Sequence, residues 1–445
     1  MSLFYETKNI YENKEELPEI FKTAEGYIDF MTRCKTERTC VAYFQKRAEE
    51  QGYKPLEKGA KLQSGDKFYI VNRGRSIFLG IMGKRPVEEG LHIAAAHIDS
   101  PRIDLKPCPL YESEGLALLK THYYGGIKKY QWTTIPLALE GVVVLSDGQT
   151  VDLSGNDYTF TISELLIHLA HEQMEKSASK VIEGESLRVI AGSIPDMTAD
   201  KDKVKAAVLQ ILNEKYGMAE KDFISAELTL VPKFDPAELG FDKSLIGAYG
   251  HDDRICAYTA FEALMQTEAP EKTALVALVD KEEIGSDGVG GMQSQFMELV
   301  FGRIAPGVPL PELCYQSKCL SADVNAALDP LYPAPTEAQN CCRLSHGPCI
   351  TKYTGARGKS STSDASAETM GYFTRLFDAN GIRWQTGLLG AVDAGGGGTV
   401  AKYMANRNID TVDIGIGLLS MHAPFEIASK ADIYETIRAF HAFLK

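Results

Sequence analysis

Residues 274–283 read ALVALVDKEE, six apolar residues followed at once by four charged ones that end in Glu282 and Glu283. An apolar run of this length and flanking is typical of a buried strand. Residues 91–97, LHIAAAH, repeat the pattern and place His97 at the end of a second run. In an open α/β sheet, ligands bind beyond the carboxyl ends of the strands. The two stretches therefore predict an α/β fold with polar groups gathered at one sheet edge.

Three more residues of kinds that commonly bind metals belong to this pattern. Asp323 comes after residues 319–322 and His422 after the apolar stretch 412–419, and Asp252 belongs to the same set. Each residue alone is more often structural or solvated. Together, imidazole and carboxylate groups suit zinc, and a two-metal site needs a bridging carboxylate with terminal ligands on either side. The set predicts a two-metal hydrolase.

Composition limits the class of protein. The chain has 445 residues, 44% hydrophobic and 24% charged, which is typical of a globular protein of two or three domains. Its formal charge of -13, with no basic block, disfavours nucleic-acid binding and favours small molecules or peptides as partners. No apolar stretch approaches the roughly twenty residues of a membrane span, and residues 1–8 carry no signal-peptide pattern, so we expect no membrane association and a cytoplasmic location.

The nine cysteines lack any Cys-x-x-Cys pair. An odd count without paired spacing argues against a disulfide framework and against a cysteine zinc ribbon. We expect reduced and mostly buried thiols.

The pattern of apolar residues changes twice along the chain. Residues 1–103 and 237–445 alternate between helical and strand patterns, whereas 104–236 is richer in strand-like pieces and supplies none of the five ligands. A discontinuous catalytic domain with an inserted second domain is therefore predicted. The expected helices cover residues 16–31, 38–51, 163–177, 201–216, 254–266, 366–380, 398–406 and 432–444. The expected strands include 67–71, 76–81 and 226–232.

Five short motifs carry a resemblance to a known family: AHIDSPR (96–102), HDDR (251–254), DKEEIGS (280–286), SAD (321–323) and SMH (420–422). In order and spacing, over nearly the whole chain, they resemble the aspartyl aminopeptidases, a family of cocatalytic-zinc exopeptidases, in a divergent bacterial-type form. The resemblance implies a twisted mixed sheet flanked by helices, of the zinc exopeptidase type, with an inserted β-rich dimerisation domain. It also implies a homo-oligomer in which dimers assemble into dodecamers.

The resemblance also assigns roles to the residues of the motifs. The implied metal ligands are His97, Asp252, Glu283, Asp323 and His422. Asp252 would bridge two divalent ions, most simply Zn²⁺, with Co²⁺ or Mn²⁺ as alternatives. Glu282 would stand off the metals as general base, and Asp99 would hold the second nitrogen of His97 and fix its orientation.

Residues 352–359, KYTGARGK, bear on substrate choice. Three cations on this stretch suit an acidic side chain at the first substrate residue, and Lys352 falls where the resemblance suggests a substrate-facing lysine. The alternative is a solvated loop leading to a helix capped by Ser363 or Asp364.

Two other segments are candidate substrate contacts. The glycines of residues 393–399, DAGGGGT, precede a predicted helix, and the amides of Gly397 and Gly398 could face a substrate oxygen. His168 resembles a family histidine that reaches from the insert into a neighbouring subunit. On an apolar helix face, the alternative is a core histidine.

Some positions depart from the family pattern. Ile98 stands where a small polar residue is expected, Asp253 where asparagine is usual, and residues 352–363 differ from typical aspartyl enzymes. The sequence therefore predicts a metalloaminopeptidase acting on small peptides with a free amino terminus, with acidic or broader specificity. A related deacylase or carboxypeptidase, or a non-catalytic peptide-binding scaffold, remains an alternative.

Overall fold

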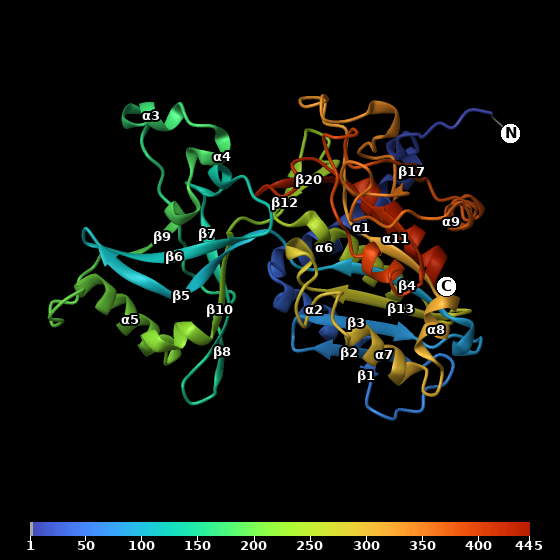
Figure 1. Ribbon diagram of the computed structural model, residues 1–445, viewed down its shortest axis with the longest axis horizontal. Coiled ribbons are helices and arrows are strands. Elements are labelled where there is room, and N and C mark those ends of the chain that lie inside the picture. The colour runs from blue at the N-terminus through green and yellow to red at the C-terminus, as the bar shows by residue number, and fades with distance from the viewer. Residues whose placement is uncertain (1–2) are drawn as a thin grey trace. The chain divides into compact units, whose positions relative to one another are not determined.

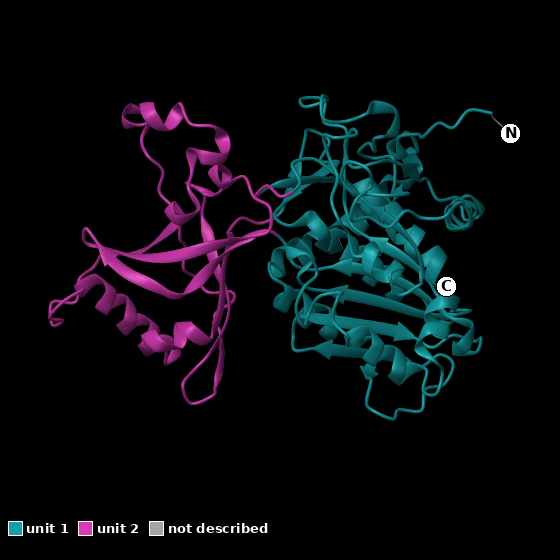
Figure 2. Ribbon diagram, viewed as in Figure 1, with its two compact units in different colours: residues 1–100, 236–421, 425–445 teal, residues 101–235, 422–424 magenta. Residues whose placement is uncertain are grey.

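The computed structural model describes residues 3–445 and divides into two compact units (Figure 2). The first comprises the described residues up to Ser100, Pro236–Met421 and Phe425–Lys445. The second comprises Pro101–Asp235 and His422–Pro424. The main breaks lie at 100/101 and 235/236, and the predicted domain boundaries are at 103/104 and 236/237. Within the described residues, no helix combines the length and the apolar character needed to cross a membrane.

A nine-stranded mixed sheet forms the centre of the first unit, in the order β1-β2-β3-β13-β4-β14-β18-β16-β17 (Figure 1). Its strands are β1 (Lys54–Pro55), β2 (Lys67–Asn72), β3 (Ser76–Ile81), β4 (Leu91–His97), β13 (Thr273–Val279), β14 (Lys318–Ala322), β16 (Cys349–Thr351), β17 (Gln385–Thr386) and β18 (Asp410–Gly415). Strands β13, β4, β14 and β18 are parallel to their neighbours in that order. Their carboxyl ends therefore share one edge of the sheet.

Both faces of this sheet are buried, which explains the continuous apolar runs. Along β13, Val276 packs into one hydrophobic cluster and Leu275 and Ala277 into another, as the strand period of two requires. The first cluster draws on helices α1 (Leu17–Arg33), α2 (Glu37–Glu50), α6 (His251–Met265), α9 (Ala367–Ala379) and α11 (Lys430–Leu444). The second draws on α7 (Phe296–Ile304), α8 (Leu310–Gln316) and α10 (Ala401–Ala405). The unit is thus a three-layer α/β structure, as predicted.

Smaller pairings complete the first unit. A three-stranded sheet joins β11 (Ala237–Leu239), β12 (Leu245–Ala248) and β20 (Glu426–Ser429), and a two-stranded one joins β15 (Asn325–Ala326) and β19 (Gly417–Leu418). Strand β12 leads directly into α6.

The second unit is built on an antiparallel six-stranded sheet in the order β8-β7-β10-β5-β6-β9. Its strands are β5 (Arg102–Ser113), β6 (Leu116–Tyr124), β7 (Leu137–Val144), β8 (Thr150–Asp152), β9 (Arg188–Gly192) and β10 (Ala226–Pro232). Its helices include α3 (His171–Met174), α4 (Ala178–Val181) and α5 (Lys203–Tyr216). The β-rich character of the insert agrees with the prediction.

The long helix predicted over residues 163–177 is wrong. The chain forms a 3-10 turn, η5 (Ile167–Leu169), and the single helical turn α3. Leu166, Ile167 and Leu169 are exposed, so no packing against this unit stabilises a longer helix. Without tertiary packing, a helix of this length is marginal in water. The helix predicted over 398–406 is also shorter, because it begins only after the glycine run.

Candidate metal centre

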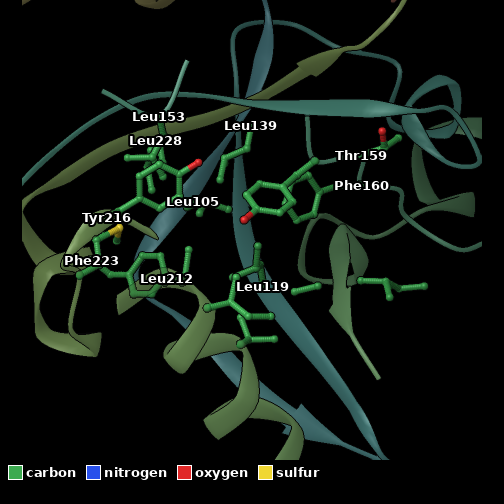
Figure 3. A pocket seen from close by; sticks show the side chains of 16 residues that line it. Leu105, Leu119, Leu139, Leu153, Thr159, Phe160, Leu212, Tyr216, Phe223 and Leu228 are labelled. Carbon is green, nitrogen blue, oxygen red and sulfur yellow. The ribbon is translucent and has the colours of Figure 1, made fainter. Parts of the chain in front are cut away.

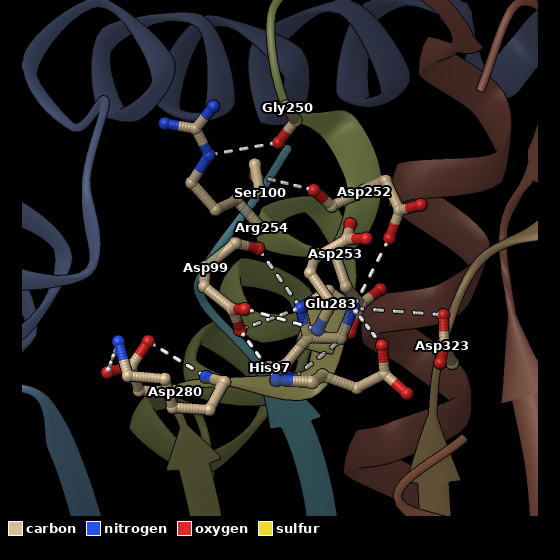
Figure 4. A network of polar contacts seen from close by, with 12 residues as sticks. His97, Asp99, Ser100, Gly250, Asp252, Asp253, Arg254, Asp280, Glu283 and Asp323 are labelled. Carbon is tan, nitrogen blue, oxygen red and sulfur yellow. Dashed lines mark hydrogen bonds and ion pairs between the residues drawn. The ribbon is translucent and has the colours of Figure 1, made fainter. Parts of the chain in front are cut away.

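The candidate site lies where the parallel strands of the first unit end (Figure 4). His97 is the last residue of β4, and its register partner on β13 is Val279, four residues before Glu283. Asp323 follows β14 directly. Because β13, β4 and β14 run parallel, their terminal side chains meet at one edge, as the sequence predicts.

His97 lies at the centre of the group and is 1% exposed. Its Nε2 is 3.3 Å from Asp252 Oδ1, 3.9 Å from Asp323 Oδ1 and 4.0 Å from Glu282 Oε2. One imidazole nitrogen thus faces three carboxylates from three separate elements. Donors of one zinc ion lie about 2.0–2.2 Å from it, so they must be within roughly 4 Å of one another. These spacings satisfy that requirement.

Asp99 contacts both His97 and the glutamate pair. His97 Nδ1 lies 3.0 Å from the Asp99 carbonyl oxygen and 3.3 Å from its Oδ1. The same carboxylate accepts hydrogen bonds from the backbone N–H of Glu282, at 3.1 Å, and of Glu283, at 3.2 Å. These two glutamates form a single 3-10 turn, η8 (Glu282–Ile284), which follows Lys281 in the left-handed conformation. Asp99 therefore positions the glutamate turn as well as the histidine, a contact that the sequence did not reveal.

Asp252 is held at the first turn of α6 by contacts on both sides. Ser100 Oγ donates to the Asp252 carbonyl at 2.6 Å, and the Asp252 N–H donates to Glu426 Oε2 at 3.1 Å. Gly250 precedes the helix with φ 73°, and a Cβ there would overlap the Arg254 guanidinium. Sequence reasoning missed Glu426 and Gly250. A glycine directly before an acidic helix start was the available signal for Gly250.

Charges in this group perturb one another. Burial lowers the pKa of His97, but hydrogen bonds to Asp252 and Asp99 outweigh it and raise that pKa well above its usual value. Burial raises the pKa of Asp323, and the nearby Glu282 carboxylate raises it further. Burial also raises the pKa of Asp253, whose Oδ2 accepts from the His97 N–H at 3.4 Å. Excess negative charge in a buried pocket is the environment that a divalent cation relieves.

The described residues offer three overlapping sets of metal donors. They are His97, Glu282 and Asp323; His97, Asp252 and Glu283; and Asp252, Asp253 and Asp323. In each set, one donor atom per residue lies within 4.8 Å of the others. Imidazole nitrogen with carboxylate oxygen is a donor set that fits zinc. The fifth predicted ligand, His422, belongs to the second unit, where its Nδ1 lies 2.8 Å from the Gly126 carbonyl oxygen.

The predicted substrate contacts fall on three loops. Lys352 Nζ donates to Asp364 Oδ1 at 2.6 Å and to the Ala365 carbonyl at 2.7 Å. The helix after this loop is capped by Ser366, so the cap at Ser363 or Asp364 that the alternative interpretation included is wrong. A cap must lie directly before the first helical residue, and α9 starts three residues after Asp364.

The structure shows where two further predicted substrate contacts, Gly397 and His168, lie. The Gly397 carbonyl accepts from the Gly355 N–H at 2.9 Å, and Gly397 and Gly398 both lie in the loop before α10 rather than at its first turn. His168 lies in the exposed turn η5, so the alternative of a core histidine is wrong. The helical spacing of apolar residues indicates an apolar face, but it does not show whether other residues pack against that face.

Comparisons with known proteins fit this fold. Residues 30–444 match the family described as aminopeptidase I zinc metalloprotease, M18. A probable M18 family aminopeptidase 1 of Clostridium acetobutylicum is 48% identical over 459 residues and covers 99% of both chains. The crystal structure of an M18 aminopeptidase from Thermotoga maritima is 44% identical, covers 99% of each chain and superposes with a TM-score of 0.95.

A more distant structure, described as an S. cerevisiae mApe1 dodecamer, is 22% identical, covers 94% of this chain and 95% of that one, and has a TM-score of 0.76. At that identity it shows the fold alone. The nearer matches define a zinc metallopeptidase that acts as an aminopeptidase. The chain belongs to the M18 family, and the resemblance identified from the five motifs is confirmed.

Proposed function

We propose that the chain removes amino-terminal residues from peptides by a two-metal mechanism. His97, Asp252, Glu283, Asp323 and His422 would hold the ions, and Asp252 would bridge them. The observation that carries this proposal is the place of Asp252, which occurs in one donor set with His97 and Glu283 and in another with Asp323. A carboxylate with further ligands on either side is what two adjacent ions require.

Glu282 serves as general base in this proposal. When bound, the ions would lower the pKa of a water molecule and polarise the scissile carbonyl. Glu282 would take a proton from the attacking water and deliver it to the departing amine. Its place is set by the hydrogen bond from its own N–H to Asp99, which keeps the carboxylate 4.0 Å from His97 Nε2.

The neighbouring glutamates provide a matched test. We expect Glu282→Gln to keep the zinc content and to lower kcat by about 10²- to 10⁴-fold, the usual contribution of a general base. Glu283→Gln should instead lose zinc. Zinc content by elemental analysis and kcat on the same preparations separate the two roles. Wild-type kcat in Glu282→Gln would remove Glu282 from the mechanism, and loss of zinc in that variant would make it a ligand.

We further propose that the enzyme accepts neutral as well as acidic amino-terminal residues. Asp364 lies 2.6 Å from Lys352 Nζ and 2.7 Å from Lys359 Nζ, so one carboxylate of the chain already offsets part of the positive charge. An acidic substrate residue must compete with it.

The test of specificity uses aminoacyl nitroanilides of Asp, Glu, Leu and Lys. Asp364→Asn should raise the ratio of kcat/KM for Asp over Leu, and Lys352→Met should lower it. Equal ratios in wild type and both variants would exclude this loop from specificity. Acylated amino acids in the same panel test the alternative of a deacylase.

The proposed assembly is a homo-oligomer, as large as a dodecamer, built through the second unit. Ile167 and Leu169 are 66% and 69% exposed on either side of His168, and an apolar segment of this kind is typical of a protein contact. His168 would then reach a neighbouring active site. Light scattering and activity of Ile167→Lys test this together, since a fully active monomer would contradict it.

A further inference from the structure

The second unit contains an apolar cavity that the peptidase reaction does not use (Figure 3). It has a volume of about 150 Å³ and lies between the six-stranded sheet and helix α5. Leu105, Leu139 and Leu228 line it from the sheet, and Val208 and Leu212 line it from the helix. A cavity of similar size lined by Leu, Ile and Phe side chains is large enough to hold benzene.

A lysine side chain lies against the aromatic residues that line this cavity. Lys215 Nζ lies 4.4 Å from the ring centroid of Tyr158, which lines the cavity, and 5.3 Å from that of Tyr216, which lines it too. Lys233 Nζ donates to the Thr159 hydroxyl and the Tyr158 carbonyl, both at 2.8 Å, and to the Asp157 carbonyl at 3.0 Å, so its three N–H groups are all used. Among residues 3–445, the Lys215 ammonium group forms no ion pair with a carboxylate. Lys215 is therefore the cation beside the cavity that is available to a ligand.

We propose that this cavity binds a small aryl carboxylate, with its ring among the leucines and its carboxylate at Lys215. The volume limits the apolar body to about one aromatic ring. Lys215 selects the charge, because an ammonium group donates strong hydrogen bonds to a carboxylate. Ligand sites in proteins commonly combine an apolar lining with a few polar groups in this way.

The test uses 3-phenylpropanoate as the probe and its neutral alcohol, 3-phenylpropanol, for comparison. Calorimetric titration of the full-length protein should show saturable binding of both compounds, tighter for the carboxylate. Lys215→Met should weaken the carboxylate about two- to fivefold, the range of an exposed charge pair, and leave the alcohol unchanged. Lys221→Met, a lysine of the same unit outside the cavity lining, is the control. Ala191→Leu extends a lining side chain into the cavity and should weaken both compounds at least tenfold.

Three results would overturn the proposal. The first is the absence of saturable binding at millimolar concentrations. The second is equal affinity for carboxylate and alcohol in the wild type together with no effect of Lys215→Met. The third combines two observations: the wild type does not bind the probe, and Ala191→Leu changes the oligomeric mass measured by light scattering. Together they would show that a second copy of the chain fills the cavity. Because Lys215→Met changes only an exposed side chain, the proposal stays testable even if Ala191→Leu folds poorly.

Discussion

Replacing Asp99 by asparagine should weaken zinc binding without removing any predicted ligand. The Asp99 carboxylate accepts the N–H groups of Glu282 and Glu283 at 3.1 and 3.2 Å and lies 3.3 Å from His97 Nδ1. Asparagine keeps one acceptor oxygen and turns an NH₂ group toward a donor, so one part-buried N–H loses its partner, at a cost of about 1 kcal/mol. Groups that orient metal ligands typically contribute 10- to 100-fold to affinity or activity. We expect zinc affinity and kcat/KM to fall by that factor.

Asp432 supplies a matched control for this substitution. It is also fully buried, and its two oxygens accept the N–H groups of Ser345 and Gly347, both at 2.7 Å. Asp432→Asn should lower the urea midpoint of the protein about as much as Asp99→Asn does. It should leave zinc affinity unchanged, as measured by competition with a chromophoric chelator. Equal zinc affinity in Asp99→Asn and wild type would refute the positioning role and leave Asp99 as a structural cap.

Two further substitutions test the fold around the site. His92 has a pKa lowered to about 4, chiefly by burial, so its neutral form favours the folded state. Stability is then present above the unfolded pKa of about 6.5 and is lost as the pH falls, by about 1.5 kcal/mol between pH 6.5 and 5. His92→Gln should flatten this slope in urea unfolding at several pH values, and an unchanged slope would exclude His92 as its source. A Cβ at Gly415 would overlap the Asp323 carbonyl oxygen, so Gly415→Ala should lower both stability and zinc affinity, by about 2 kcal/mol and tenfold. Gly302→Ala, with open space around its Cβ, should be neutral or stabilising, and similar melting curves for the two variants would contradict the steric argument.

The apolar runs made the sheet predictable, because a strand buried on both faces has to be apolar throughout. The same runs placed His97 and Asp323 at strand ends, and parallel pairing then brought them together. The bond from Asp99 to the glutamate turn depends on the backbone conformation of Lys281, at φ 73°, which local propensity does not favour. Sequence pattern therefore located the site but not the contacts that position its side chains.

The failures of the prediction have a common physical origin. Residues 163–177 carry helical apolar spacing, yet the chain places those side chains in solvent, where no tertiary contact stabilises a helix. The cap of α9 is Ser366, whose side chain accepts from the Thr369 N–H, and not Ser363, although serine suits a cap at either position. Both errors concern the tertiary contacts of a segment, and a single sequence carries little information on those contacts.

The electrostatics of the site imply that zinc binding releases protons. Burial and the neighbouring Glu282 raise the pKa of Asp323, and Asp252 with Asp99 raises that of His97 against the effect of burial. Without a cation, these shifts favour the protonated forms of residues that must be ionised carboxylates or neutral imidazole to act as ligands. A bound cation favours the opposite forms and relieves the repulsion among the carboxylates. The arrangement that makes these charges unfavourable to one another is thus the one that a divalent ion would stabilise.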